Sequence, residues 1–380
     1  MDEHDQVAAS LPEGVPEKGI APESGSLDFR CGNCGAVMAW DPDADALACE
    51  FCGERRAVPA APDPIRERSL DEAGAAAHGL GLELRAARCQ VCGASVAFDR
   101  AAVAVTCVFC GSGRVLVEEA RRNPIRPESL VPLDLSRAGV EQAFRKWLSG
   151  LWFRPNALQR LRDFRAVGVY VPYWTYDCHV HSVWTAQAGY YYWVTESYTT
   201  RVNGRSVRRT RRVRKVRWVP AAGERADDFD DLPVLASKGI DEALADRLGE
   251  YDRSALVPYR PDYLAGWAAE EYQVTLADGW ERGRDKAAAV QEGRCAGDVP
   301  GDTHRFLCVR NRFSGVRWKH VLLPMWSLTF EWRGARYPVL VHGQTGRVVG
   351  RAPWSWVKIA ALALLLAAAI GAGFALMSAA

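Results

Sequence analysis

The sequence of 380 residues lacks the short motifs that mark the commonest catalytic sites. It has no G-x-x-x-x-G-K-[ST] loop to hold nucleotide phosphates, and no glycine-rich dinucleotide turn. It also has no G-x-S-x-G nucleophile turn and no H-E-x-x-H metalloprotease helix. These absences favour a protein that is not an enzyme.

The sequence also lacks a strong net charge, since its formal charge is only +2, and the overall balance predicts no class of partner. Charge is nevertheless unevenly distributed. The first 30 residues hold seven acidic side chains against Lys18 and Arg30, whereas residues 201–217 hold nine arginines or lysines and no acid. Residues 1–27 are rich in Glu, Asp, Pro, Gly and Ser, which predicts a disordered acidic tail. The tail has no basic region followed by an apolar run, so we do not expect a signal peptide.

Cysteine is abundant, and eight of the 11 cysteines fall into two clusters with the same spacing, C-x2-C-x14-C-x2-C. The second cluster repeats the first 58 residues further along the chain. Two C-x-x-C turns can deliver four thiolates to a tetrahedral zinc ion. The alternatives are a disulfide framework or unrelated buried thiols, and the identical spacing favours zinc. The predicted ligands of the two Zn²⁺ ions are Cys31, Cys34, Cys49 and Cys52, and Cys89, Cys92, Cys107 and Cys110.

The residues around these cysteines are typical of zinc ribbons. A glycine follows the second cysteine of every pair, at positions 35, 53, 93 and 111, where it allows a turn with positive φ. The stretch between the pairs is long enough for a small β-hairpin. The duplication also extends past the ligands, because Pro64-Ile65-Arg66 reappears as Pro124-Ile125-Arg126. Zinc thiolates need a reducing compartment, which predicts a cytosolic location for the ribbons.

The end of the chain predicts a membrane span. From Ile359 to Ala380 no residue is charged, and about 20 apolar residues cross a bilayer as a helix. Trp354 and Trp356 precede this run at the place where aromatic side chains favour the headgroup region, and Lys358 flanks it. The alternative is a buried core helix. We expect a tail-anchored, single-pass protein of the cytoplasmic (inner) membrane with its N-terminus in the cytosol.

The middle of the chain predicts an antiparallel α+β domain. Apolar residues at helical spacing favour a helix from near Ser136 to Gly150, and aromatic runs between residues 167 and 194 favour strands. Asn203-Gly204 between two strand-like runs predicts a hairpin, and a helical insertion and further strands follow. The expected organisation is a disordered tail (1–27), zinc ribbon 1 (28–59), a linker (60–84), zinc ribbon 2 (85–118), a linker (119–137), an α+β domain with a helical insertion (138–350), and a juxtamembrane segment with a transmembrane helix (351–380).

Two further groups of residues are candidates for binding. His179 and His181 lie on one face of a strand, where two imidazoles can share a metal, although hydrogen-bonded strand histidines are the alternative. The second strand of the predicted hairpin, from Arg205 to Arg217, is basic. It can contact anionic lipid, an acidic protein partner or nucleic-acid phosphates, or it can be a solvated edge strand. Its candidate contact residues are Arg205, Arg208, Arg209, Arg211, Arg212, Arg214, Lys215 and Arg217.

The twin ribbons and several later segments together resemble a family of bacterial membrane-anchored zinc-ribbon proteins. Members are often labelled as relatives of primosomal protein N′ (replication factor Y), a helicase, or as TFIIB-type zinc-finger proteins. This chain lacks helicase motor motifs, so the resemblance does not imply helicase activity. It implies zinc at the ribbon cysteines and an association with flotillin-like (SPFH) or PspA-like proteins. Besides the two ribbons, the segments that carry this resemblance are 124–132, 144–147, 151–156, 169–176, 322–326 and 342–346.

Three hypotheses follow from the sequence. The leading one is a non-enzymatic, tail-anchored adaptor that recruits or scaffolds a flotillin-like or PspA-like partner at the membrane. The second is a zinc-dependent nucleic-acid-binding protein, because zinc ribbons often present a hairpin to DNA or RNA. The third is an enzyme that uses a metal at His179 and His181.

Overall fold

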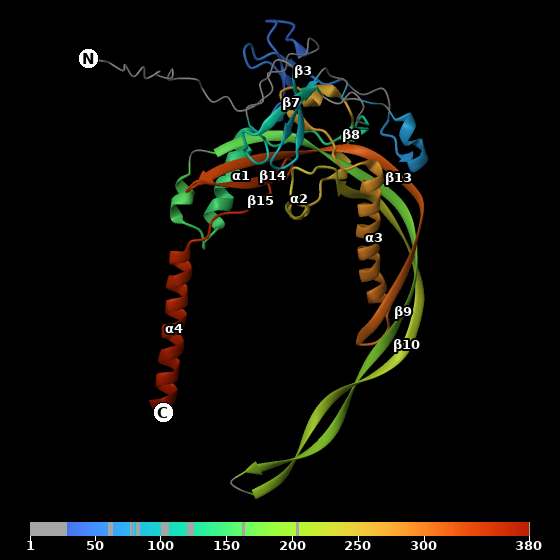
Figure 1. The fold of residues 1–380 in the computed structure, drawn as a ribbon, viewed down its shortest axis with the longest axis vertical. Helices are drawn as coiled ribbons and strands as arrows, with labels where there is room; N and C mark the ends of the chain where they lie inside the picture. The colour runs from blue at the N-terminus through green and yellow to red at the C-terminus, as the bar shows by residue number, and fades with distance from the viewer. Residues whose placement is uncertain are drawn as a thin grey trace, which may run out of the picture.

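A large curved sheet of 12 strands dominates the described part of the chain (Figure 1). The computed structural model describes residues 29–59, 64–76, 78, 80, 84–99, 106–119, 125–161, 164–202 and 205–379. The predicted acidic tail (1–27) and the turn residues Asn203 and Gly204 lie outside these ranges. The strands of the sheet are β4 (Arg68–Ser69), β5 (Leu84–Cys89), β6 (Ser95–Asp99), β7 (Val115–Glu119), β8 (Ser129–Leu130), β9 (Phe164–Val202), β10 (Arg205–Leu235), β11 (Val257–Pro258), β12 (Ala268–Glu270), β13 (Thr303–Trp332), β14 (Ala335–His342) and β15 (Val348–Gly350).

The sheet is mixed and has three very long strands. Its main path runs β11-β8-β13-β9-β12-β6-β5-β7, with β10 on β9, β4 and β14 on β13, and β15 on β14. The pairs β12–β9 and β13–β8 are parallel, whereas the long pairs β9–β10 and β9–β13 are antiparallel. A separate three-stranded sheet belongs to the first ribbon. Its strands are β1 (Ala39–Asp41), β2 (Ala46–Ala48) and β3 (Arg55–Arg56).

The fold class predicted from the sequence is therefore wrong. We expected an antiparallel α+β domain beside two small independent ribbons. One mixed sheet instead dominates, and the three strands of the second ribbon are part of it because β6 pairs with β12. The predicted separate strands between residues 167 and 194 are one continuous strand, β9, since no residue in that run forces the chain to turn.

Four α-helices accompany the sheets in the described residues: α1 (Arg137–Gly150), α2 (Glu242–Leu248), α3 (Leu276–Asp298) and α4 (Trp356–Ala379). The predicted helix from Ser136 to Gly150 is confirmed, with Ser136 at its N-cap position. Helix α3 packs very closely on the sheet. A Cβ atom at Gly279 would lie 2.5 Å from the Tyr176 hydroxyl, so the glycine permits this approach. Short 3₁₀ turns cover Leu70–Ala75, Asn156–Arg160, Arg253–Ala255 and Pro261–Leu264.

The central part of the sheet is buried on both faces. Because side chains alternate along a strand, Tyr170 points to one face while Val169 and Val171 point to the other. Tyr170 belongs to a core that includes Phe144 of α1 and Trp40 of the first ribbon. Val169 and Val171 belong to a second core, which includes Phe109 of the second ribbon. The two ribbons thus contribute to opposite faces of one sheet.

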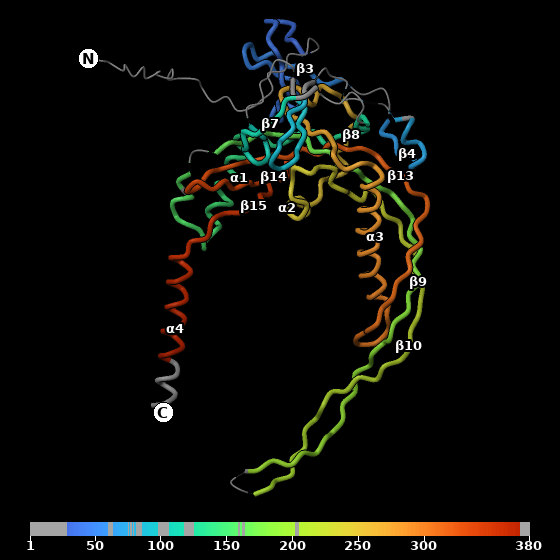
Figure 2. Tube along the Cα trace, viewed as in Figure 1, coloured from blue at the N-terminus to red at the C-terminus, as the bar shows by residue number. Residues whose placement is uncertain are grey.

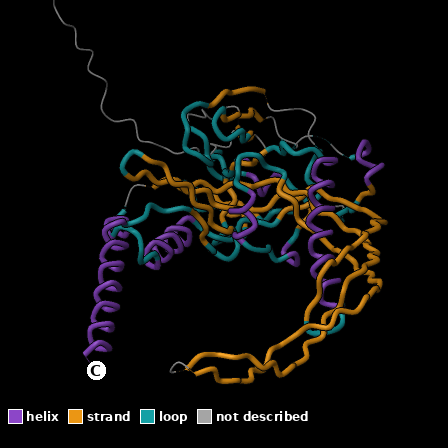
Figure 3. The backbone as a smooth tube through the Cα atoms, turned by 60° about the horizontal axis from the view of Figure 1, so that its bottom comes forward, coloured by secondary structure: helices purple, strands orange, loops and turns teal. Residues whose placement is uncertain are grey.

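A long hairpin, formed by the outer parts of β9 and β10, projects far from this double-sided core (Figures 1 and 2). The first residue of β13, Thr303, pairs with Gly189, so β9 and β10 continue beyond that point as a pair on their own. We call residues 190–202 and 205–217 the basic arm. The rotated view shows the same two strands extending past the rest of the sheet (Figure 3). The predicted hairpin is confirmed, because Arg205 pairs directly with Val202.

The C-terminal segment corrects the membrane predictions. In the part of the chain that the structure describes, no helix combines the length and the apolarity that a bilayer crossing requires. Helix α4 (Trp356–Ala379) covers the predicted segment and carries the charged Lys358 in its first turn. This finding contradicts the predicted transmembrane helix. It equally contradicts the tail anchor, the membrane as a partner and the single-pass inner-membrane location.

Candidate metal centres

The structure brings the eight predicted cysteines together as two groups of four. Within each group the sulfur atoms all lie within 4.8 Å of one another. In the first group, the sulfurs of Cys31 and Cys52 lie 3.4 Å apart, and those of Cys34 and Cys49 lie 3.5 Å apart. In the second group, Cys89 and Cys110 lie 3.6 Å apart, and Cys92 and Cys107 lie 3.5 Å apart. Each group is therefore close enough to hold a metal ion.

These separations fit tetrahedral coordination. A tetrahedral ion with metal–sulfur bonds of about 2.3 Å requires sulfurs about 3.8 Å apart. All eight thiols are free, and a disulfide would require about 2.05 Å between sulfurs. The four thiolates of each group would fill a tetrahedral shell, which is typical of structural rather than catalytic sites.

Each C-x-x-C pair is shaped by the glycine that follows it. The amide of Gly35 donates to the carbonyl of Cys31 at 2.9 Å, and the three other glycines repeat this turn at 2.9–3.0 Å. Their φ angles lie between 67° and 81°, a region that favours glycine. The predicted role of these glycines is confirmed. The repeated turns are those at Gly53, Gly93 and Gly111.

The four thiols of a group compete for protons. The backbone N–H of Cys52 lowers the pKa of the Cys49 thiol to about 7, and the contact with Cys92 lowers the pKa of Cys107 to about 5. That same contact raises the pKa of Cys92 far above its ordinary value. Four adjacent thiolates repel one another, and a bound cation relieves this repulsion because it stabilises all four charges.

Both zinc ribbons attach to the same short segment of the chain, residues 265–269. In the first, the Trp40 amide donates to the Ala265 carbonyl at 2.9 Å, and the Trp40 indole donates to Leu133 at 3.0 Å. In the second, Ala97 pairs with Ala269 in β12. The duplicated hairpins thus dock four residues apart on one stretch of chain, which ties each four-cysteine group to the sheet.

The two centres differ in exposure. Cys34 and Cys52 are exposed, whereas the equivalent Cys92 and Cys110 are half-buried. The difference in exposure is greatest inside the last C-x-x-C turn of each ribbon. In the first ribbon, Phe51 of this turn is 81% exposed. Its counterpart in the second ribbon, Phe109, is only 4% exposed. The sequence repeat reveals this equivalence but not the difference in burial.

The two candidate strand histidines are not brought to a metal-binding group. His179 Nδ1 lies 2.8 Å from a carboxylate oxygen of Asp228, and His181 Nε2 lies 3.5 Å from one of Glu224. Among the described residues, neither histidine belongs to a set of three or more close metal-ligating side chains. The geometry therefore favours strand histidines paired with neighbouring acids.

All eight predicted basic residues of the arm are exposed, from Arg205 to Arg217. One acid, Glu196, lies in the arm, and it pairs with Lys215 at 2.8 Å and with Arg211 at 3.5 Å. Aromatic rings alternate with the charges. The guanidinium of Arg214 lies 4.2 Å from the centre of the Tyr191 ring, and three further arginines cover aromatic rings of β9 at 5.4–5.7 Å. The arm is thus a basic and aromatic surface with little internal neutralisation.

The fold assembles a cluster of carboxylates that no sequence pattern predicts. Glu67, Asp177 and Asp231 come together from distant parts of the chain. Lys319, which is almost fully buried, lies 2.8 Å from Glu67 and 2.6 Å from Asp231. Burial raises the pKa of Asp177 to about 6. Because Lys319 already supplies a cation, the cluster is an internal ion network that needs no metal.

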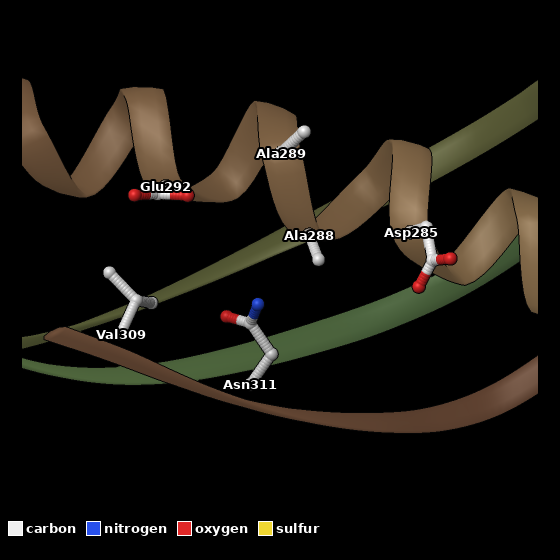
Figure 4. A pocket seen from close by; sticks show the side chains of 6 residues that line it. All are labelled: Asp285, Ala288, Ala289, Glu292, Val309 and Asn311. Atoms are coloured by element: carbon white, nitrogen blue, oxygen red, sulfur yellow. The ribbon is translucent and has the colours of Figure 1, made fainter.

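A pocket of about 360 Å³ lies between α3 and β13 (Figure 4). Figure 4 shows Asp285 and Glu292 on the helix, above Val309 and Asn311 on the strand. The Asn311 side chain accepts a hydrogen bond from the Ser182 hydroxyl at 2.6 Å. The pocket contains none of the residues that the sequence predicted as ligands.

The fold and these sites together define a β-rich protein with two four-cysteine centres able to hold metal ions. No protein-family profile matches the chain, and no solved structure matches it. A curated protein of Bacillus subtilis (strain 168), "Uncharacterized protein YdjG", is 26% identical over 347 residues. That similarity covers 88% of this chain and 92% of the curated protein. It extends over nearly the whole length of both chains, and the name of that protein assigns it no activity.

Proposed function

We propose that this chain is a non-enzymatic adaptor in which two zinc ions hold a duplicated pair of ribbons on a scaffold that docks a protein partner. One observation carries the proposal: each four-cysteine centre lies at the end of a hairpin that bonds to the same segment, at Ala265 and Ala269. The metal centres are thus parts of the scaffold. An adaptor requires such a rigid body with exposed surfaces.

Zinc is the metal that fits best. Four thiolates in a tetrahedron are its usual structural ligand set, and softer sulfur ligands exclude magnesium and calcium. A closed set of four leaves no open position for a substrate or an activated water molecule. This arrangement supports a structural role. Zinc would stabilise small hairpins that bury too little apolar surface to fold alone.

The basic arm supports the docking part of the proposal. It projects from the body as two strands and exposes nine positive side chains beside Tyr191, Tyr192, Trp193 and Tyr198. Arginine and aromatic side chains dominate the energetics of protein interfaces. An acidic partner surface would complement the arm and accelerate association.

A binding experiment tests the proposal. Purified full chain is titrated with purified flotillin-like and PspA-like proteins, the candidates that the family resemblance implies. The variant Arg209→Glu/Arg212→Glu should bind at least about tenfold more weakly than wild type. The matched control Arg145→Glu/Lys146→Glu reverses the same number of exposed charges on α1 and should bind like wild type. If neither candidate binds the wild type, this choice of partner is wrong.

Binding to single-stranded nucleic acid is a second candidate function, favoured by the alternation of arginines with exposed rings in the arm. Stacking of bases on aromatic side chains and phosphate contacts to arginine are the usual features of such sites. A fluorescent oligonucleotide titrated with the full chain tests it. Affinity that falls steeply with salt, and that is lost on charge reversal at Arg208, Arg209, Arg211 and Arg212, would establish nucleic-acid binding in place of protein docking.

A further inference from the structure

The second ribbon shows how its last C-x-x-C turn docks on a sheet. We call the two residues between the cysteines of that turn the knuckle. In the second ribbon the knuckle is Val108 and Phe109, and both side chains are almost fully buried in one core of the main sheet. The Ser327 hydroxyl donates to the Val108 carbonyl at 2.8 Å, and the Thr329 hydroxyl donates to that of Phe109 at 3.4 Å.

This docking mode has three chemical parts. A sheet face provides an apolar socket for one aromatic ring. Hydroxyl groups, spaced two residues apart on β13, satisfy the two knuckle carbonyls. Close approach is permitted by Gly111, where a Cβ atom would lie 3.3 Å from a methyl carbon of Thr329.

The first ribbon has an equivalent knuckle, but no sheet face of the described residues receives it. Its knuckle is Glu50 and Phe51, both exposed, and Phe51 is the counterpart of Phe109 in the repeat. A Cβ atom added at Gly53, the counterpart of Gly111, meets nothing within 4 Å. Among the described residues, Phe51 has the highest exposed fraction of any large apolar side chain, whereas its counterpart in the repeat is buried.

We propose that the Glu50–Phe51 knuckle docks a protein partner in the way that the second ribbon docks on β13. The partner presents an apolar socket for one aromatic ring on a β-sheet face, with hydroxyl donors for the two carbonyls. Glu50 replaces the buried Val108, so the socket has a basic rim. This inference rests on the proposed adaptor function and adds a second docking surface to the basic arm.

The partner is a different protein from this one. In a second copy of this chain, the face of β13 that offers such a socket is already filled by that copy's own Val108 and Phe109. The basic arm is a separate surface, since Phe51 belongs to the first ribbon at the opposite end of the molecule (Figure 1). The two surfaces can therefore be tested independently.

Site-specific photocrosslinking in cells that contain the full chain tests the inference. The probe is p-benzoylphenylalanine placed at Phe51. The matched control is the same probe at Val91, an exposed apolar residue in the first C-x-x-C turn of the second ribbon. The expected result is one discrete protein adduct from position 51 and none from position 91. The captured protein, once purified, should bind Phe51→Ala about thirtyfold or more weakly than wild type. The variant should keep the zinc content and the unfolding midpoint of the wild type.

The other outcomes overturn the inference. A captured protein that binds wild type and Phe51→Ala equally well shows that the knuckle is not the docking surface, while the adaptor function stands. An adduct only with a second copy of this chain, or only with nucleic acid, also contradicts it. If no protein binds the chain by crosslinking or by titration, the proposed function fails together with the knuckle.

Discussion

Two equivalent phenylalanines should respond very differently to the same substitution. Phe51 and Phe109 occupy the same position of the repeat, yet one is 81% exposed and the other 4% exposed. We expect Phe109→Ala to destabilise the protein strongly and Phe51→Ala to leave its stability unchanged. The pair is its own control, because both changes remove the same atoms beside a four-cysteine centre.

The expected difference follows from burial. Replacing a buried phenylalanine by alanine costs about 3–5 kcal/mol, the sum of lost transfer free energy and the cavity left behind. Phe109 packs in the core with Val108, and little of that core can collapse into the gap because Ser327 and Thr329 hold the knuckle backbone in place. A surface substitution away from special features usually changes the free energy of unfolding by less than about 0.5 kcal/mol.

Urea unfolding of the zinc-loaded full chain, followed by tryptophan fluorescence and far-UV circular dichroism, measures both free energies. The midpoint should fall for Phe109→Ala and stay fixed for Phe51→Ala, with unchanged m-values. Equal losses in the two variants would refute the reasoning, because they would mean that both knuckles are buried in solution or that neither is.

Three further predictions concern other parts of the fold. Lys319→Met should cost about 3 kcal/mol in urea unfolding, because it leaves Glu67 and Asp231 as uncompensated, partly buried charges; a loss below 1 kcal/mol, roughly a surface pair, would contradict the ion network. Burial lowers the pKa of His320 to about 4, so its contribution is present above the unfolded pKa of about 6.5 and is lost as pH falls towards 4. Wild type should therefore lose about 2 kcal/mol more than His320→Gln between pH 7 and pH 5, and equal losses would show that the imidazole is hydrated. Charge reversal at the exposed arginines of the basic arm should change the free energy of unfolding by less than about 0.5 kcal/mol, and a larger loss would mean that the arm packs on the body.

The two four-cysteine centres were largely readable from the sequence because their chemistry is local. Each C-x-x-C-G segment forms its own turn, and the separation between pairs allows a hairpin to bring the sulfurs together. The helix from Ser136 and the Asn203-Gly204 hairpin were readable for the same reason. A cap, an apolar face and a two-residue turn are all specified within a few residues.

The remaining features depend on contacts that no local pattern encodes. The parallel pairing of β12 with β9 joins residues 99 positions apart in the sequence. The union of the second ribbon with the main sheet, through Ala97 and Ala269, joins residues 172 positions apart. The carboxylate cluster around Lys319 forms in the same way. The predicted membrane span rested on composition alone, and the described helices do not provide it.

The zinc content of the purified full chain tests the central claim most directly. Metal analysis should find two zinc ions per chain, and one each in Cys52→Ser and Cys110→Ser, with removal of zinc by a chelator lowering the urea midpoint. A chain that unfolds at the same urea concentration with and without a chelator, or that purifies folded without zinc, would contradict the claim that the ribbons are structural zinc sites of the scaffold.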